Sequence, residues 1–249
     1  MSKFNKDSGS YIFTFAVIMT VLLGAILAFT SESLKDKQKA EREFERKKFI
    51  LSAALGSETI NKMAAQNRQD VEDLYSSRVK DFVVDTKGEK IEGMSAKDVI
   101  VAKEYKLPTD QRKLPVYTVA KEGSDEVAYY VMPIYGYGLW DNIFGYVSLQ
   151  NDLNTVQGVI FDHVGETPGL GARITEAEVQ NRYQGKKILD EQGKLVSVDM
   201  QKGEGADYSN APHKVNGMTG ATITGKGVNN MMLAYLGLYE GYFNKINKN

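Results

Sequence analysis

The sequence of 249 residues contains no cysteine, two histidines and one tryptophan. Without cysteine the chain forms no disulfide and offers no thiolate to an iron–sulfur cluster. His163 and His213 alone are too few ligands for an ordinary structural zinc site, and neither is assigned a role. By itself the chain therefore holds neither kind of metal centre.

The sequence also lacks an excess of either charge, because its 31 lysines and arginines are balanced by 32 acidic residues. Nucleic-acid binding depends on a basic surface that neutralises phosphates, so the charge balance gives no case for nucleic acid as a partner. No internal repeat or low-complexity segment is present. At 42% hydrophobic and 25% charged residues, the chain suffices for one membrane helix and one or two compact units.

One segment, residues 11–30, carries no charge and is mostly apolar. Twenty helical residues span about 30 Å, the thickness of the hydrocarbon core of a bilayer. We therefore predict a transmembrane helix at 11–30, surrounded by membrane lipid and preceded by a short cytoplasmic N-terminus, residues 1–10. A cleaved signal peptide is the alternative, but its apolar segment is usually shorter, about 7–15 residues, and no clear A-x-A site follows.

The remaining chain predicts an α+β fold behind this single N-terminal transmembrane helix. Residues 31–49 are predicted as a charged helical stalk, and residues 50–125 as an accessory α/β region that is helical to about residue 80, with a short strand and turn at 82–89. Residues 126–249 are predicted as an α+β domain. Its expected strands are rich in β-branched and aromatic residues and lie at 127–133, 143–149, 156–161 and 195–200.

An amphipathic helix is expected after Thr222, because apolar residues recur there at helical spacing. These residues are Val228, Met231, Met232, Tyr235, Leu236, Tyr239, Tyr242 and Phe243.

The most informative segment is residues 216–224, Asn-Gly-Met-Thr-Gly-Ala-Thr-Ile-Thr, which places a hydroxyl just before the expected helix. Glycine lets a ligand approach the main chain, and the free N–H groups of a helix start favour an anion. An ordinary helix N-cap also prefers threonine and glycine. A nucleotide-binding G-x-x-x-x-G-K loop fits residues 220–226, but Gly227 stands where that loop requires Ser or Thr.

Residues 219–222, Thr-Gly-Ala-Thr, resemble the S/T-G-A-T flavinylation motif, whose last threonine carries FMN through a phosphoester bond made by a dedicated flavin transferase. The resemblance implies that Thr222 is the acceptor. The family pattern usually has Asp six positions before the acceptor, where this chain has Asn216. The neighbouring residues implied to bind the cofactor are Thr219, Gly220, Ala221, Ile223 and Thr224.

A second segment, residues 166–171, reads Glu-Thr-Pro-Gly-Leu-Gly and contains a Pro-Gly pair suited to a type II turn. It resembles the second signature of the FMN-binding domains in the C-type subunits of Na+-translocating NADH:quinone reductases (the NQR complex) and in the related G-type subunits of Rnf complexes. That signature lies against the flavin ring. The residues implied to bind the cofactor here are Glu166, Thr167, Gly169, Leu170 and Gly171.

A third segment, residues 136–141, reads Gly-Tyr-Gly-Leu-Trp-Asp. It resembles the G-x-G-L-W segment of the C-type NQR subunits, which implies that Leu139 and Trp140 contact the flavin. Without the resemblance, the segment reads as a glycine turn that joins two strands, with tryptophan as a core residue.

The three motifs occur in the order and spacing of the family and cover the chain from about residue 130 to its end. The resemblance implies a covalent FMN-binding domain at 126–249. The implied function is an electron-transfer subunit in a membrane complex that oxidises NADH, reduces quinone and exports Na+. Its implied partners are the other membrane subunits and, during maturation, the flavin transferase. The long segment before the domain favours the NQR family over the Rnf family, and a non-redox membrane-anchored binding protein is an alternative of another class.

The topology is predicted against the charge count. Two lysines precede the span and seven basic residues follow it closely, which by the positive-inside rule would leave the large domain in the cytoplasm. The family layout is the reverse, with a single pass through the inner membrane and an extracytosolic domain. Because long domains translocate largely regardless of charge, we expect the extracytosolic location.

Overall fold

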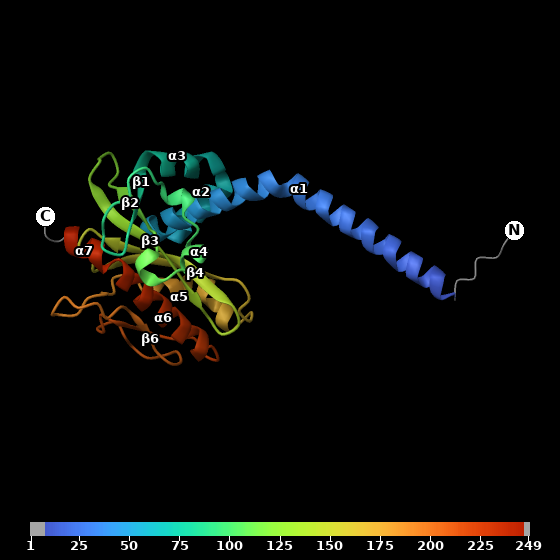
Figure 1. The fold of residues 1–249 in the computed structure, drawn as a ribbon. Coiled ribbons are helices and arrows are strands. Elements are labelled where there is room, and N and C mark those ends of the chain that lie inside the picture. The colour runs from blue at the N-terminus through green and yellow to red at the C-terminus, as the bar shows by residue number, and fades with distance from the viewer. Residues whose placement is uncertain (1–7, 247–249) are drawn as a thin grey trace. The chain divides into compact units, whose positions relative to one another are not determined.

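A computed structural model describes residues 8–246 (Figure 1). Residues 1–7, most of the predicted N-terminal segment 1–10 with its two lysines, lie outside the described residues. The chain divides into two compact units, Met1–Arg46 and Lys47–Asn249.

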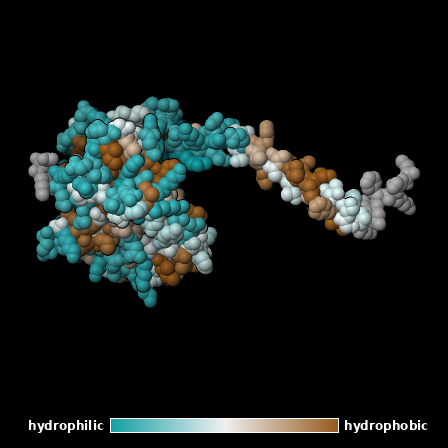
Figure 2. Space-filling view, viewed as in Figure 1, coloured by the Kyte–Doolittle hydropathy of each residue, from teal (hydrophilic) through white to brown (hydrophobic). Residues whose placement is uncertain are grey.

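The first unit consists of most of helix α1, which runs without a break over Gly9–Leu55. The predicted span 11–30 and stalk 31–49 are therefore parts of one helix. Within the described residues, α1 is the one helix long and apolar enough to cross a membrane. The apolar side chains of its segment 11–30 are exposed, Phe29 by 78% for example, and form the hydrophobic stretch visible in Figure 2. The hydroxyls of Thr20 and Thr30 donate to carbonyls one turn earlier, at 2.8 Å each, as suits a helix in lipid.

Further helices follow in the second unit. Gly56, with φ of 96°, ends α1, and α2 (Ser57–Gln66) and α3 (Arg68–Arg78) follow. Asn67 separates them, and its side chain caps α3 by accepting from the N–H of Gln69 at 3.0 Å. The short helices are η1 (Ala96–Asp98), α4 (Val101–Glu104), η2 (Thr109–Gln111), η3 (Gly171–Thr175) and α5 (Ala177–Asn181).

A five-stranded antiparallel sheet forms the centre of this unit, with its strands in sequence order. The strands are β1 (Val79–Val84), β2 (Leu114–Ala120), β3 (Val127–Tyr137), β4 (Asn142–Gln150) and β5 (Val156–His163). The strands expected near 82 and at 127–133, 143–149 and 156–161 are confirmed, and the last three extend further. The sheet joins β1 and β2, from the predicted accessory region, to the strands after residue 126, and a domain boundary at 125 stays a prediction.

Strand β2 was not expected from the sequence, and it contains a proline, a residue that is uncommon inside strands. Pro115 lies at the start of β2, opposite Val83 of the edge strand β1. The pairing of β2 with β3 begins only at Tyr117, so the missing N–H of proline interrupts no bond there.

The predicted strand 195–200 is wrong over most of its length. Strand β6 (Asp199–Met200) pairs in parallel with β7 (Lys214–Val215), and Leu195 forms one isolated antiparallel bridge with Leu189. Ser197 has φ of 63°, and the N–H groups of Val196 and Ser197 both donate to the carbonyl of Ile188, at 2.8 Å each. This irregular contact, with two N–H groups on one carbonyl, replaces the regular ladder that a strand would need.

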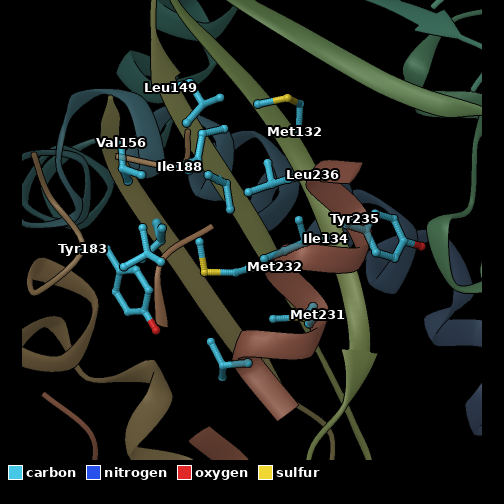
Figure 3. Close-up of a cluster of buried hydrophobic side chains, with 14 of the residues drawn as sticks. Met132, Ile134, Leu149, Val156, Tyr183, Ile188, Met231, Met232, Tyr235 and Leu236 are labelled. Carbon is cyan, nitrogen blue, oxygen red and sulfur yellow. The ribbon is translucent and has the colours of Figure 1, made fainter. Parts of the chain in front are cut away.

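Helix α6 (Thr222–Leu238) covers one face of the sheet. Figure 3 shows Met231, Met232 and Leu236 of α6 in one buried cluster with Met132 of β3 and Leu149 of β4. The expected amphipathic helix is therefore confirmed, although it ends at Leu238 and a separate helix, α7 (Glu240–Ile246), follows. Between the two, the buried Tyr239 donates its hydroxyl to the carbonyl of Pro115 at 2.8 Å.

The start of α6 approaches the end of β3 at glycines. A Cβ placed on Gly227 would lie 2.3 Å from the carbonyl oxygen of Tyr137 and 3.1 Å from the Cα of Gly138. The helix backbone therefore lies against the turn that follows β3, and this approach places the residues before Gly227 beside that turn.

Candidate functional site

The three sequence motifs meet at one carboxylate, that of Glu166, which is only 4% exposed. One oxygen, Oε1, accepts from the N–H groups of Leu139 and Trp140, at 2.9 Å each. The other, Oε2, accepts from the hydroxyl of Thr224 at 2.6 Å. The carboxylate thus joins the β3–β4 turn, the segment 166–171 and the first turn of α6.

Two glycines make room for this carboxylate. A Cβ on Gly138 would lie 2.4 Å from Oε1, and a Cβ on Gly171 would lie 2.4 Å from Oε2 and 2.5 Å from Oγ1 of Thr224. Real Cβ contacts do not occur at such distances, so both motifs need glycine at these positions.

The segment 166–171 forms the turn expected from its Pro-Gly pair. The N–H of Leu170 donates to the carbonyl of Thr167 at 3.1 Å, and Gly169 has φ of 75°, as the third residue of a type II turn requires. His163 fixes the start of the segment, because its Nδ1 accepts from the N–H of Glu166 at 3.2 Å. Gly220, with φ of 79°, would carry a Cβ 2.8 Å from Cδ2 of Leu170, so this turn touches the loop before α6.

The three threonines of residues 219–224 have different surroundings. Thr224 is 1% exposed and donates to Glu166. Thr219 is exposed and lies beside the carboxylate of Glu204, whose pKa its hydroxyl and N–H help to lower. Thr222 is partly exposed and is the first residue of α6. The first N–H groups of a helix have no partner within the helix and attract an anion.

A cluster of ion pairs holds the loop before α6. Glu204 pairs with Arg173 at 2.9 Å and with Arg182 at 3.1 Å, and these hydrogen bonds lower its pKa from 4.5 to about 2. Arg182 also donates to the carbonyls of Asn216 and Gly217. The cluster therefore connects α5 to the segment that carries the threonines.

Asn216 binds the same surrounding loop through its side chain. Its Oδ1 accepts from the N–H of Ala206 at 3.1 Å, and its Nδ2 donates to the carbonyl of Ala206 at 2.6 Å. An aspartate could accept the first bond, but as an anion it could not donate the second. Asparagine at this position thus pairs with both polar groups of one main-chain residue.

Apolar side chains from all three motifs are exposed around the junction. Trp140 is 69% exposed, Ile223 56%, Leu139 45% and Leu170 42%. The indole N–H of Trp140 donates to Oγ1 of Thr167 at 3.1 Å, which joins two motifs at the surface. A cavity of about 740 Å³ lies between α2, α3 and the β2–β3 turn and includes none of these residues.

This surface fits the chemistry of FMN. A flat aromatic ring covers exposed apolar side chains, and a phosphate binds at a helix start. Among residues 8–246 no group of three or more metal-ligating side chains occurs. The buried Glu166 and Thr224 lie below this surface, and direct contact between them and a flavin stays a prediction.

Several residues of the site were not expected from the sequence. Arg182 and Glu204 lie outside every motif, and only their convergence in space gives them a role. Gly138 lies within the G-x-G-L-W segment, whose glycine could have been expected to face a close neighbour.

Comparisons with known proteins identify relatives of this chain. The FMN-binding domain family matches residues 138–237. The chain is 32% identical to the C-type subunit of Na+-translocating NADH-quinone reductase from Haemophilus ducreyi, with 95% of this chain and 93% of that protein covered. It is 31% identical to the corresponding protein of Neisseria meningitidis serogroup B, with 99% and 96% covered.

Solved structures give the same result. The crystal structure of the corresponding protein from Parabacteroides distasonis superposes with a TM-score of 0.70 at 31% identity, covering 84% of this chain and 96% of that one. The crystal structure of NqrC from Shewanella oneidensis has a TM-score of 0.70 at 26% identity, covering 84% and 100%.

Proposed function

Because the chain belongs to the NqrC family, the C-type subunits of Na+-translocating NADH-quinone reductases, we propose that Thr222 carries FMN through a phosphoester bond and that the flavin ring lies on the apolar surface around Trp140 and Leu170. The chain is an FMN-carrying, membrane-anchored electron-transfer subunit of this complex, and other subunits of the complex are its partners. These relatives do not favour the Rnf alternative.

The choice of Thr222 as the attachment site rests on the different surroundings of the three threonines. Thr224 is buried and engaged with one carboxylate, and Thr219 lies beside another, so a phosphate at either would meet negative charge. Thr222 stands at the start of α6, where N–H groups and the helix dipole favour an anion.

Attachment forms a bond between Oγ1 of Thr222 and the phosphorus of FMN, and the hydroxyl proton leaves. Direct condensation of the FMN phosphate with the hydroxyl, which releases water, is unfavourable in aqueous solution. The flavin donor must therefore carry its phosphate as an anhydride, and the second phosphoryl group of that anhydride is the leaving group. This requirement supports the flavin transferase as a partner during maturation. We expect the intact mass of the native protein to exceed that of the chain by FMN less one water.

After attachment, the chain holds the phosphate of FMN and orients the flavin ring. The first turn of α6 holds the phosphate, and the three motif segments present apolar side chains to the ring. Bound FMN supplies the electron transfer. No proton-transferring side chain is required of the protein for this task.

The ring location can be tested with Leu170→Ala and Trp140→Ala. Each change removes apolar contact area from the proposed ring surface, so we expect a shifted flavin absorbance or midpoint potential with the covalent bond retained. Since both side chains are about half exposed or more, the fold should persist. If the spectra and potentials of both variants match those of the unchanged protein, the flavin ring does not lie on these segments, and they are ordinary turns.

We also propose that α1 anchors the chain in lipid of the inner membrane and that the domain after it is extracytosolic. The test is a reporter fused after Asn249. Alkaline phosphatase is expected to be active there, and a fluorescent protein that matures only in the cytosol is expected to stay dark. The opposite pattern would place the domain in the cytoplasm.

A further inference from the structure

Glu166 is a buried carboxylate without a basic partner. It is 4% exposed, and in the described range 8–246 it forms no ion pair with lysine or arginine. Its charge is met by neutral donors, namely N–H groups of the β3–β4 turn and the hydroxyl of Thr224. A buried charge that is hydrogen-bonded but not neutralised keeps its field, which solvent and salt screen poorly at such depth.

The carboxylate is ionised at neutral pH. Burial alone would raise the pKa of Glu166, but the hydroxyl of Thr224 and the N–H groups of Trp140, Leu139 and Asp141 outweigh burial and hold this pKa below its ordinary value. The same contacts fix its position, since one oxygen binds the turn that carries Trp140 and the other binds α6.

We propose that Glu166 sets the reduction potential of the flavin, by placing one fixed negative charge directly beneath the ring surface. The proposal rests on the proposed ring location around Leu139, Trp140 and Leu170. An electron that arrives on the ring adds negative charge near this carboxylate, so reduction costs more than it would over a neutral group. Glu166 therefore holds the midpoint potential low.

The experiment is a spectroscopic redox titration of the full-length, flavin-loaded protein with Glu166→Gln. The amide keeps the size of the side chain and removes its charge. At a fixed solution potential we expect the ratio of reduced to oxidised flavin to rise several-fold. A tenfold rise corresponds to about 59 mV for one electron.

Two controls separate charge from shape. Glu166→Asp shortens the side chain but keeps the charge, so its potential should stay much closer to that of the unchanged protein. Asp125→Asn also removes one negative charge, but Asp125 precedes β3 at the end opposite the motif turn. With about 3.3 Å per residue along an 11-residue strand, that charge is roughly 36 Å from the turn, and no shift is expected.

The unchanged protein and Glu166→Gln form one pair that differs in charge, and a second pair keeps the test valid if Glu166→Gln folds poorly. Glu166→Asp and Glu166→Asn share the smaller volume and differ in charge, so the asparagine variant should have the higher potential. Equal potentials within each pair would overturn the proposal. If Leu170→Ala and Trp140→Ala still shift the spectrum, the ring location stands and only the role of the charge is wrong, whereas no shift in any variant rejects the location.

Discussion

The Thr222→Val protein, produced together with an active flavin transferase, is expected to carry no covalent flavin. Valine nearly preserves the shape of threonine and removes the oxygen that would bond to phosphorus. Thr222 begins α6 and is only partly exposed, so the fold should tolerate the change. The measurement is the intact mass, which should lack the increment of FMN less one water, together with the flavin fluorescence of the denatured band, which should vanish.

Matched variants show whether the hydroxyl itself matters. Thr222→Ser keeps a hydroxyl and should retain some covalent flavin. Thr224→Val removes the donor to Glu166 but leaves Thr222 intact, so the covalent bond should form. Flavin that survives denaturation of the Thr222→Val protein would show that the acceptor is another residue, and peptide mapping would then identify it, with Thr219 the first to examine.

Gly227→Ala is expected to destabilise the domain by about 1–2 kcal/mol, although glycine to alanine inside a helix ordinarily stabilises by about 1 kcal/mol. The new Cβ would lie 2.3 Å from the carbonyl oxygen of Tyr137, which is backbone and cannot rotate away. Either α6 or the β3–β4 turn must move. For a domain of this size the melting temperature should fall by about 2–8 °C. Thermal unfolding of the full-length protein in detergent measures the change.

Gly237→Ala in the same helix is the matched control. Its Cβ would have Leu195 as nearest neighbour, at the ordinary contact distance of 3.8 Å. Alanine there should therefore be neutral or slightly stabilising. A Gly227→Ala protein as stable as Gly237→Ala would mean that the helix and the turn are not packed as closely as described. Because the turn carries Trp140, the flavin absorbance of Gly227→Ala should shift as well.

The local parts of the site could be predicted because each depends on neighbours in sequence. Pro168 and Gly169 specify a type II turn by themselves, and the turn is present. The apolar spacing after Thr222 specifies the helix face that meets the sheet. The sequence also shows that Gly227 stands where a nucleotide-binding loop requires Ser or Thr. The structure explains the glycine, because a Cβ at this position would meet the carbonyl oxygen of Tyr137.

The parts that could not be predicted depend on residues far apart in the chain. Glu204 and Arg182 are 22 positions apart, and no periodicity links them. Glu166 and Thr224 are 58 positions apart, and only the fold brings the hydroxyl to the carboxylate. The prediction of a strand at 195–200 was wrong for a local reason. Its residues favour a strand, but the φ of 63° at Ser197 bends the chain locally.

The position of Trp140 gives the molecule a built-in optical signal. It is the sole tryptophan of the sequence, and its ring lies exposed at the junction of the motifs, anchored through its indole N–H to Thr167. Tryptophan emission overlaps flavin absorption, so a flavin on this surface accepts excitation energy from the indole at close range. If the flavin lies at the proposed location, we expect the intrinsic emission of the chain to fall as the cofactor site is filled, without any label and without interference from a second indole.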